Sequence, residues 1–344
     1  MNKTKSIVLC GGGTAGHIIP NIALLPELKK YFTKITYLGE ANSMEEEIAK
    51  QNNLDFVPIK CVKFNRESLV KNIKIPFVLK SYINDCKKIL KELSPSIVFS
   101  KGGYVSLPVV LASKRLNIPY CIHESDSSIG LANKLVAKNA KFVFTNFKNT
   151  YNAPNVLNVG IPLREDLFSS RSRESILSEL GLENRKTILV TGGSSGAKNI
   201  NEVVYSLAPS ITKRYNLIHL TGKNKSQKIL ANGYLQMEFS NDMGKLYKVS
   251  DVVVSRAGAT TIAELNALNK KAILIPLSKS ASRGDQIKNA EQMIGSPTYA
   301  VIDDDALNVD NLKTTIDGLI LTPNVKENTK ENPSVIISKI LSLI

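Results

Sequence analysis

The chain has 344 residues, 43% of them hydrophobic, with a mean hydropathy of −0.06 and a net charge of +15 at pH 7. This length suits two domains, and the lack of any run of roughly 20 apolar residues excludes a membrane-spanning helix. The first residues, Met-Asn-Lys-Thr-Lys before a strand-like run, are unlike a signal peptide, so we expect a cytoplasmic protein.

The cysteines and histidines do not have the spacing of metal ligands. The four cysteines form no C-x-x-C pair, and the three histidines form no H-E-x-x-H arrangement. Reduced, buried thiols are the ordinary state of such cysteines in a cytoplasmic protein. We therefore expect no metal site and no bound cofactor.

The first predicted strand ends in a glycine loop. "SIVLC" is followed by Gly11, Gly13 and Gly16, which satisfy G-x-G-x-x-G, and a helix is expected over residues 17–31. Glu40 closes the second predicted strand, where a dinucleotide-binding protein has the acid that binds ribose. These features by themselves favour an NAD-dependent dehydrogenase.

Strand-like and helical segments then alternate along the whole chain, and the pattern restarts near residue 187. Such alternation predicts parallel sheets with helices on both faces. We predict an α/β protein of two Rossmann-like domains, residues 1–160 and 161–332, joined near Gly160–Pro162. The last helix, 333–344, is expected to pack back on the first domain.

Two further turns in the second domain argue against a dehydrogenase. One is the glycine-rich stretch 192–196, and the other is "SRAGATTIAE", where Gly258 precedes a helix that contains Glu264. Small residues at a helix start let a diphosphate lie on backbone amides, and a carboxylate is well suited to bind two ribose hydroxyls. We therefore expect the nucleotide diphosphate in the second domain.

The positive charge is concentrated in the first half of the chain. Residues 1–160 carry 22 Lys and Arg against 11 Asp and Glu, a net charge of +11, and the remainder carries +4. The basic segment 62–93 interleaves apolar residues with lysines, a pattern that favours an anionic membrane surface. The residues expected to face the membrane are Lys74, Ile75, Phe77, Val78, Leu79 and Lys80. An ordinary amphipathic helix with a solvated basic face remains the alternative.

Seven motifs in register resemble the MurG family of bacterial glycosyltransferases. They are "GGGTAGHIIP" (11–20), "KGGYVSLP" (101–108), "IHESDSSIGLANKL" (122–135), "VGIPLR" (159–164), "GGSSGAKNIN" (192–201), "SRAGATTIAEL" (255–265) and "SRGDQIKNA" (282–290). The resemblance implies the GT-B fold, in which two Rossmann-like domains face each other across a cleft. It also implies inverting transfer of N-acetylglucosamine (GlcNAc) from UDP-GlcNAc to lipid I, which is undecaprenyl-pyrophosphoryl-MurNAc-pentapeptide, where MurNAc is N-acetylmuramic acid. The acceptor group is the C4 hydroxyl of MurNAc, and the product is lipid II for peptidoglycan synthesis.

The same resemblance implies the binding partners. They are UDP-GlcNAc, lipid I, the cytoplasmic leaflet of the plasma membrane, where the protein would be peripheral, and other cell-wall synthesis or division proteins, with no nucleic acid. A nucleic-acid-binding protein is a poor alternative because the chain has no nucleic-acid motif and no Trp. Another GT-B enzyme with a lipid acceptor, such as a diacylglycerol glucosyltransferase, is the closer rival.

Matching the motifs position by position implies a set of substrate contacts. In the first domain these are Thr14, Ala15, Gly16 and Asp126. In the second domain they are Arg164, Ser194, Phe239, Arg256, Gly258, Ala259, Thr260, Glu264, Gln286 and Asn289. Phe239 would lie against uracil, Glu264 would bind the ribose, and Gln286 and Asn289 would lie near the sugar hydroxyls. Asp126 and Asp285 stand where many members have Asn and His, so their part in donor binding stays open.

Inversion at the anomeric carbon needs a base for the acceptor hydroxyl. His17 is the first candidate, because an imidazole titrates near neutral pH; the alternative is that it only binds a phosphate or the backbone. Glu124, which follows His123 at a strand end, could be the base, could orient His17, or could only fix its own loop. Tyr104 either borders the acceptor or closes a turn, and His219 is expected to be structural.

Overall fold

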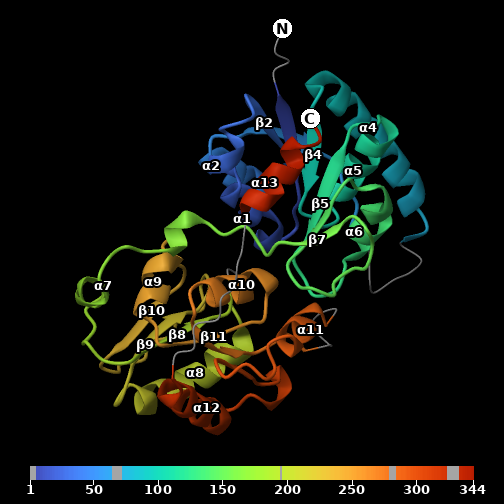
Figure 1. Ribbon diagram of the computed structural model, residues 1–344. Coiled ribbons are helices and arrows are strands. Elements are labelled where there is room, and N and C mark those ends of the chain that lie inside the picture. The colour runs from blue at the N-terminus through green and yellow to red at the C-terminus, as the bar shows by residue number, and fades with distance from the viewer. Residues whose placement is uncertain (1–4, 64–71, 194–195, 279–283, 324–332) are drawn as a thin grey trace. The chain divides into compact units, whose positions relative to one another are not determined.

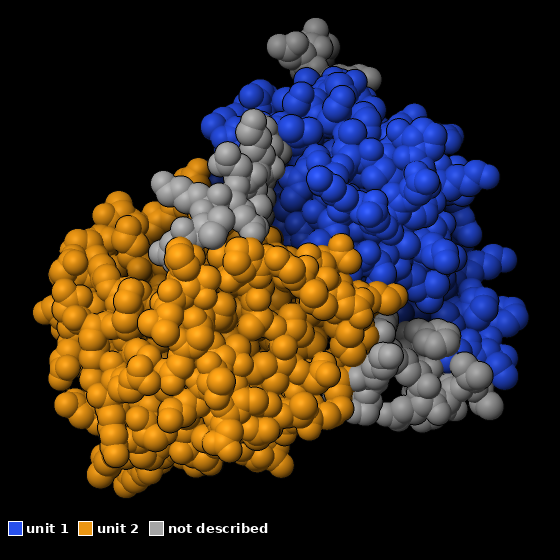
Figure 2. All heavy atoms as spheres, turned by 60° about the horizontal axis from the view of Figure 1, so that its bottom comes forward, with its two compact units in different colours: residues 1–164, 330–344 blue, residues 165–329 orange. Residues whose placement is uncertain are grey.

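The computed structural model describes residues 5–63, 72–193, 196–278, 284–323 and 333–344. They divide into two compact units, shown in blue and orange in Figure 2. Unit 1 comprises residues 1–164 and 330–344, and unit 2 comprises residues 165–329. The chain therefore passes from unit 1 to unit 2 after Arg164 and returns at its end.

Unit 1 is built on a parallel sheet with the strand order β3-β2-β1-β4-β5-β6-β7 (Figure 1). Its strands are β1 Ser6–Cys10, β2 Lys34–Glu40, β3 Asp55–Ile59, β4 Ile97–Ser100, β5 Tyr120–Glu124, β6 Val143–Thr145 and β7 Val156–Asn158. Its helices are α1 Ala15–Ala23, α2 Leu25–Leu28, α3 Met44–Gln51, α4 Ile75–Leu93, α5 Ser106–Arg115, α6 Leu131–Val136 and α13 Pro333–Leu341, with the short 3-10 turn Ala137–Asn139 after α6.

Alternate residues of the central strand enter two different cores. Ile7 and Leu9 join one buried cluster with residues of α1 and α2, while Val8 and Cys10 join another with α4 and α5. Successive side chains of a strand point to opposite faces, so a strand covered on both faces is apolar throughout. The continuous run "IVLC" is the sequence of such a strand.

The C-terminal helix belongs to unit 1. Ile336, Ile337 and Ile340 of α13 are buried in the same cluster as Ile7 and Phe32. Their spacing places the three side chains on one face of the helix. Burial of three isoleucines on the first core gives the chain end a specific place in unit 1.

Unit 2 repeats the arrangement with a parallel sheet of order β10-β9-β8-β11-β12-β13. Its strands are β8 Thr187–Thr191, β9 Asn216–Leu220, β10 Tyr234–Met237, β11 Val252–Ser255, β12 Lys271–Leu274 and β13 Tyr299–Val301. Its helices are α7 Arg173–Glu179, α8 Lys198–Ile211, α9 Met243–Val249, α10 Ala259–Ala267, α11 Asp285–Glu291 and α12 Val309–Leu321, with 3-10 turns at Glu165–Leu167 and Asp304–Ala306. The predicted fold class, α/β with two Rossmann-like domains, is confirmed.

The strand order reverses once in each sheet. In unit 1, β1 lies between β2 and β4, and in unit 2, β8 lies between β9 and β11. Ligands of open α/β sheets bind outside the carboxyl ends of the strands at such a reversal. We therefore expect ligand sites at the loops after β1 and β4 and at the loops after β8 and β11.

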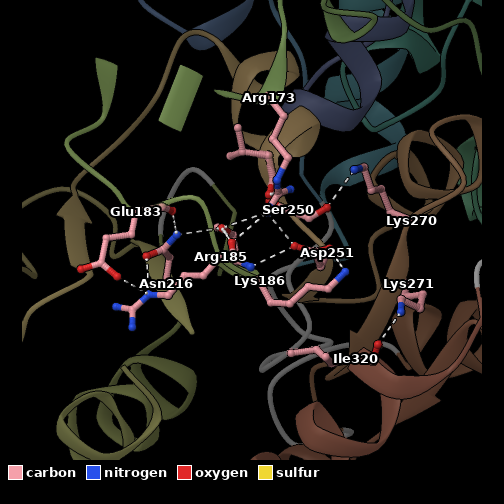
Figure 3. A network of polar contacts seen from close by, with 12 residues as sticks. Arg173, Glu183, Arg185, Lys186, Asn216, Ser250, Asp251, Lys270, Lys271 and Ile320 are labelled. Carbon is pink, nitrogen blue, oxygen red and sulfur yellow. Dashed lines mark hydrogen bonds and ion pairs between the residues drawn. The ribbon is translucent and has the colours of Figure 1, made fainter. Parts of the chain in front are cut away.

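The opposite end of the unit 2 sheet is closed by a polar network (Figure 3). The Asp251 carboxylate accepts hydrogen bonds from Arg173, Lys186 and the Thr187 amide, each at 2.9 Å. Lys270 donates to the Ser250 carbonyl oxygen at 2.8 Å. These charges tie together the amino ends of neighbouring strands, which leaves the carboxyl ends as the place for a ligand.

No helix within the described ranges combines the length and the apolar character needed to cross a bilayer.

Candidate active site

Two glycine turns pack on each other at the carboxyl ends of β1 and β4. A Cβ added at Gly103 would stand 2.3 Å from the Gly12 carbonyl oxygen, and one at Gly11 would stand 2.9 Å from Lys101 Cβ. Gly103 also has a φ of +78°, which a residue with a side chain rarely adopts. Only glycine permits so close an approach, so the spacing of the motif reflects the contact between the two turns.

The first loop is held by an acid of the protein itself. The Gly13 amide donates to Glu45 Oε1 at 2.5 Å, and the Glu45 side chain, in the first turn of α3, is buried. Beside it, the Tyr104 hydroxyl donates to Glu40 Oε2 at 2.9 Å. The Gly13 amide is therefore already bonded to a carboxylate, and Glu40, which a dinucleotide site would use for ribose, accepts a hydrogen bond from Tyr104 of the second turn.

His17 lies in the first turn of α1, next to both turns. Its Nδ1 is 3.0 Å from the Thr14 hydroxyl, and a Cβ on Gly103 would stand 3.3 Å from the same nitrogen. The ring is half-buried. The loop thus holds an imidazole, a group able to accept a proton near neutral pH, where the two glycine turns meet.

Glu124 ends β5 and binds the loop that follows it. One carboxylate oxygen accepts from the Asp126 amide at 3.2 Å, and the other accepts from the Gly130 amide and from Asn133 Nδ2, both at 2.9 Å. Burial raises the pKa of the Glu124 carboxyl. These contacts favour the loop-fixing role of Glu124 over an interaction with His17.

The unit 2 loop after β8 is shaped by its own glycines. A Cβ at Gly192 would stand 2.3 Å from the Ala197 amide nitrogen, and one at Gly196 would stand 2.1 Å from the Thr221 carbonyl oxygen. Gly193 has a φ of +81°, and a Cβ there would meet no atom of the described residues within 4 Å. The loop is therefore tightly packed on its inner side and open at Gly193. Ser194, matched to a donor contact, lies outside the described residues.

The start of α10 forms the second turn at the strand reversal of unit 2. Gly258 precedes the helix, and a Cβ added there would have only Thr261 Oγ1 near it, at 3.8 Å. Ala259 and Thr260 follow as the first helical residues. The first amides of a helix have no partner within the helix and attract anions. The space beside Gly258 lets a ligand approach these amides closely.

Glu264 lies further along α10 and is oriented by a tyrosine. The Tyr247 hydroxyl of α9 donates to Glu264 Oε2 at 2.9 Å, and both α9 and α10 are elements of unit 2. The Glu264 side chain is half-buried. The arrangement presents a carboxylate, fixed on one oxygen, beside the helix whose N-terminus is open to an anion.

Three other matched residues of unit 2 support the backbone. Arg256 Nη1 is 2.8 Å from Asp304 Oδ1 and donates to the Ile275 carbonyl oxygen at 3.1 Å. Asn289 is fully buried and donates to the Ala257 carbonyl oxygen at 3.3 Å, while Gln286 Oε1 accepts from the Leu277 amide at 3.0 Å. The described contacts of these side chains fix the turn before α10 and the segment that follows β12.

The comparisons with known proteins identify the family. Residues 7–145 match the glycosyltransferase family 28 N-terminal domain, and residues 187–342 match its C-terminal domain. A UDP-N-acetylglucosamine–N-acetylmuramyl-(pentapeptide) pyrophosphoryl-undecaprenol N-acetylglucosamine transferase of Lachnoclostridium phytofermentans is 40% identical over 351 residues, covering 99% of this chain and 98% of that protein. The chain belongs to this transferase family.

Other members and a solved structure agree with this. A transferase of the same name from Clostridium botulinum (strain Kyoto / Type A2) is 40% identical over 330 residues, covering 94% of this chain and 93% of that protein. The crystal structure of Acinetobacter baumannii MurG has a TM-score of 0.76 and 23% identity, and the match covers 98% of this chain and 99% of that chain. Because the sequence identity is only 23%, this structural similarity supports the GT-B fold and nothing further.

The remaining residues predicted for this transferase lie in loops or at the starts of helices. Phe239 is 58% exposed between β10 and α9. Arg164 ends the first segment of unit 1, and Asp126 lies in the loop fixed by Glu124. Ala15 and Gly16 form the start of α1, and Asp285 begins α11. No group of three or more His, Cys, Asp or Glu that could hold a metal ion is found in the part of the transferase that the structure describes.

The residues predicted to face a membrane lie at the start of α4 and differ in exposure. Phe77 is 77% exposed, and Ile73, just before the helix, is 67% exposed. Lys74 and Lys80 are also exposed. Ile75 and Val78 are half-buried, and so is Leu79, which packs against the buried cluster of that face.

Several residues that shape the site were not singled out from the sequence of this transferase. Glu45 stands in the run "MEEEI", where nothing distinguishes it from Glu46 and Glu47. Lys101 and Ser125 lie inside quoted motifs, but only the fold brings them together.

The expectation that His219 is structural agrees with its contacts. Tyr234 and Asn201 bind its two ring nitrogens, and burial lowers the pKa of His219 to about 4.

Proposed function

We propose that this protein transfers GlcNAc from UDP-GlcNAc to the C4 hydroxyl of MurNAc in lipid I, forming lipid II. The observation that carries the proposal is identity of 40% over nearly the full length of a transferase with this donor and acceptor in its name. The glycine turns of both units lie at the strand reversals, where ligands of such sheets bind, which supports two substrate sites in one chain.

Unit 2 is the candidate donor site. The open start of α10 offers backbone amides to the UDP diphosphate. Glu264, whose Oε2 accepts a hydrogen bond from Tyr247, supplies the carboxylate that we assign to the ribose hydroxyls. As UDP departs, negative charge develops on its diphosphate, and preorganised amides stabilise that charge.

Unit 1 is the candidate acceptor site, with His17 as the proposed base. The imidazole accepts the proton of the C4 hydroxyl as that oxygen bonds to the anomeric carbon of GlcNAc from the face opposite UDP. The bond from the anomeric carbon to the diphosphate oxygen breaks with its electrons, so the configuration inverts. The half-buried ring beside Thr14 supports this role, while the contacts of Glu124 leave it as a residue that fixes its loop.

We place the protein at the cytoplasmic face of the plasma membrane as a peripheral protein. Exposed Ile73 and Phe77 beside Lys74 and Lys80 make an apolar surface with a positive rim. Partial insertion of such a surface into an anionic leaflet gains from both burial and charge. The polyprenyl acceptor would be met in the same leaflet.

The test is transfer of radiolabelled GlcNAc by the purified full-length protein to a lipid I analogue in detergent and in liposomes. We expect a product with one added GlcNAc and release of UDP. A diacylglycerol acceptor in a parallel reaction separates the rival lipid glycosyltransferase. Product with diacylglycerol and none with the lipid I analogue would contradict the proposed acceptor.

A further inference from the structure

A lysine is buried beneath the glycine turns of unit 1. Lys101 directly follows β4, and its side chain is 1% exposed. Its Nζ is 2.6 Å from His123 Nδ1 and 2.6 Å from Ser125 Oγ. An amine removed from water is costly unless acceptors receive its hydrogens. The two acceptors therefore determine where this side chain lies.

His123 is held in one tautomer, so the lysine is the charged member of the pair. His123 Nε2 is 2.7 Å from the Gly160 carbonyl oxygen, which can only accept. Nε2 must carry the hydrogen, and the lone pair of Nδ1 receives the hydrogen of Lys101. Burial, together with the charge of Lys101, holds the pKa of His123 well below its usual value.

Lys101 also touches both glycine turns. Its amide donates to the Cys10 carbonyl oxygen at 2.9 Å, and its Cβ stands where a side chain at Gly11 would collide. The next residue, Gly102, begins the second turn. The backbone of one residue therefore joins the loop after β1 to the turn after β4, and its side chain reaches the loop after β5.

The charge of Lys101 responds to pH near neutrality. Burial lowers the pKa of the ammonium group to about 7, although the carboxylates of Glu124 and Asp126 oppose the shift. The other titratable groups at this end of the sheet are Cys10 of β1, His17 of α1, Glu40 of β2, Glu45 of α3, Tyr104 of the second turn and His123 of β5.

We propose that Lys101 is a positioning residue for the acceptor: its buried ammonium group fixes the glycine turns and supplies the positive charge that favours the acceptor's diphosphate. The inference rests on the proposed function, because that function supplies the anionic ligand. Charges interact more strongly in a dry interior than in water. A buried cation can therefore act on a diphosphate without touching it.

The test compares Lys101→Met with the wild type, using UDP-GlcNAc and the lipid I analogue between pH 6 and pH 9. At pH 6 we expect the KM for the acceptor to rise about tenfold, equivalent to about 1.4 kcal/mol, with the KM for UDP-GlcNAc unchanged. The ammonium group loses its proton as pH rises through about 7. The wild type then loses the same charge, so the ratio of the two acceptor KM values should fall toward one by pH 9.

The matched control is Lys114→Met, which removes an exposed lysine at the end of α5 and should leave the acceptor KM within twofold at every pH. A KM ratio for Lys101→Met that is constant across the pH range overturns the proposal, and so does an equal rise in the KM for UDP-GlcNAc. If the wild type itself forms no product, the proposed function fails; if the wild type is active and Lys101→Met has the wild-type acceptor KM, only this inference fails.

Ser125→Ala provides a second test that removes one acceptor and no charged group. Loss of the Ser125 hydroxyl makes the buried ammonium form less favourable. The pH at which the acceptor KM begins to rise should therefore move to a lower value than in the wild type. An unchanged midpoint would contradict the proposal even if Lys101→Met failed to fold.

Discussion

At the scale of single residues, the site depends on side chains that the protein itself holds in place. Thr14 holds His17, Tyr247 holds Glu264, and Glu45 receives the Gly13 amide. A reacting group with a fixed orientation loses less entropy on reaching the transition state. For His17 we therefore expect an effect on turnover, and for Glu264 an effect on substrate binding.

His17→Ala should lower kcat about 100-fold or more, within the range for loss of a general base, while the affinity for UDP stays nearly unchanged. Single-turnover transfer and calorimetric UDP binding measure the two quantities. Thr14→Val is the matched control, because it removes the contact at 3.0 Å and leaves the imidazole; a smaller fall in kcat is expected. A rise in acceptor KM with kcat retained would instead give His17 only a phosphate-binding role.

Glu264→Gln should weaken UDP binding about tenfold, because an amide is a poorer acceptor for two ribose hydroxyls than a carboxylate. The variant should also bind UDP and 2′-deoxy-UDP with similar affinity, as measured by calorimetry. Tyr247→Phe keeps the carboxylate and removes only its hydrogen-bond donor, so most of the preference for UDP should remain. If Glu264→Gln still preferred UDP over 2′-deoxy-UDP as strongly as the wild type, Glu264 would not be the residue that binds the ribose.

At the scale of elements, the two ends of the unit 2 sheet have different tasks. The amino ends of β8 and β11 are joined by the network around Asp251, and Lys270, just before β12, donates to the Ser250 carbonyl oxygen before β11 (Figure 3). The carboxyl ends of β8 and β11 lead into the loops that are open at Gly193 and Gly258. Since all strands are parallel, a charged residue at a strand start cannot share a site with one at a strand end.

Asp251→Asn should destabilise unit 2 by about 2 kcal/mol, because it leaves the partly buried guanidinium group of Arg173 without its carboxylate. Burial alone would raise the pKa of Asp251, but hydrogen bonds from Lys186 and the Thr187 amide, with the charge of Arg173, hold it below its usual value. This stabilisation is present above the pKa of the unfolded chain and is lost as pH falls through the lower folded value.

Urea unfolding at pH 7 and near pH 3 measures the effect, with the unit 2 transition identified by its shift with UDP. The difference between wild type and Asp251→Asn should shrink at the acidic pH. Asp305→Asn changes an exposed aspartate of the same unit and should have little effect at either pH. An Asp251 difference that is unchanged near pH 3 would contradict the ionic origin of the effect.

At the scale of the whole molecule, charge and exposed apolar residues are unevenly divided. The first 160 residues carry most of the net positive charge, and unit 1 contains the exposed apolar start of α4. An uneven charge of this kind favours association with an anionic surface through one part of the chain. Association of unit 1 with an anionic membrane can be measured by liposome binding, without an activity assay.

Ile73→Ser combined with Phe77→Ser should reduce co-sedimentation with liposomes that contain anionic lipid, because both side chains lose the apolar surface that enters the leaflet. The remaining binding should fall further with added salt, since the lysines then act alone. The matched control is Leu230→Ser combined with Leu321→Ser, which removes two exposed leucines of unit 2. Equal binding by the wild type and the α4 variant would contradict the membrane surface.

The local sequence determined where the strands and the glycine turns lie along the chain, and that the strand–turn–helix pattern occurs twice. Runs such as "IVLC" and "ILVT" predict buried parallel strands, and the glycine motifs predict the turns after them, because strand burial and tight turns depend on residues close together in the chain. The resemblance to the family followed from seven motifs in register, six of which lie at the carboxyl end of a strand.

Only the tertiary structure decided which side chains meet. Gly13 and Glu45 are 32 residues apart, Lys101 and His123 are 22 apart, and Tyr247 and Glu264 are 17 apart. It also showed that Arg256 and Asn289 support the backbone, and that Glu124 binds its own loop. Partners of this kind are brought together by the pairing of parallel strands, whose register depends on the packing of the whole sheet rather than on any one segment.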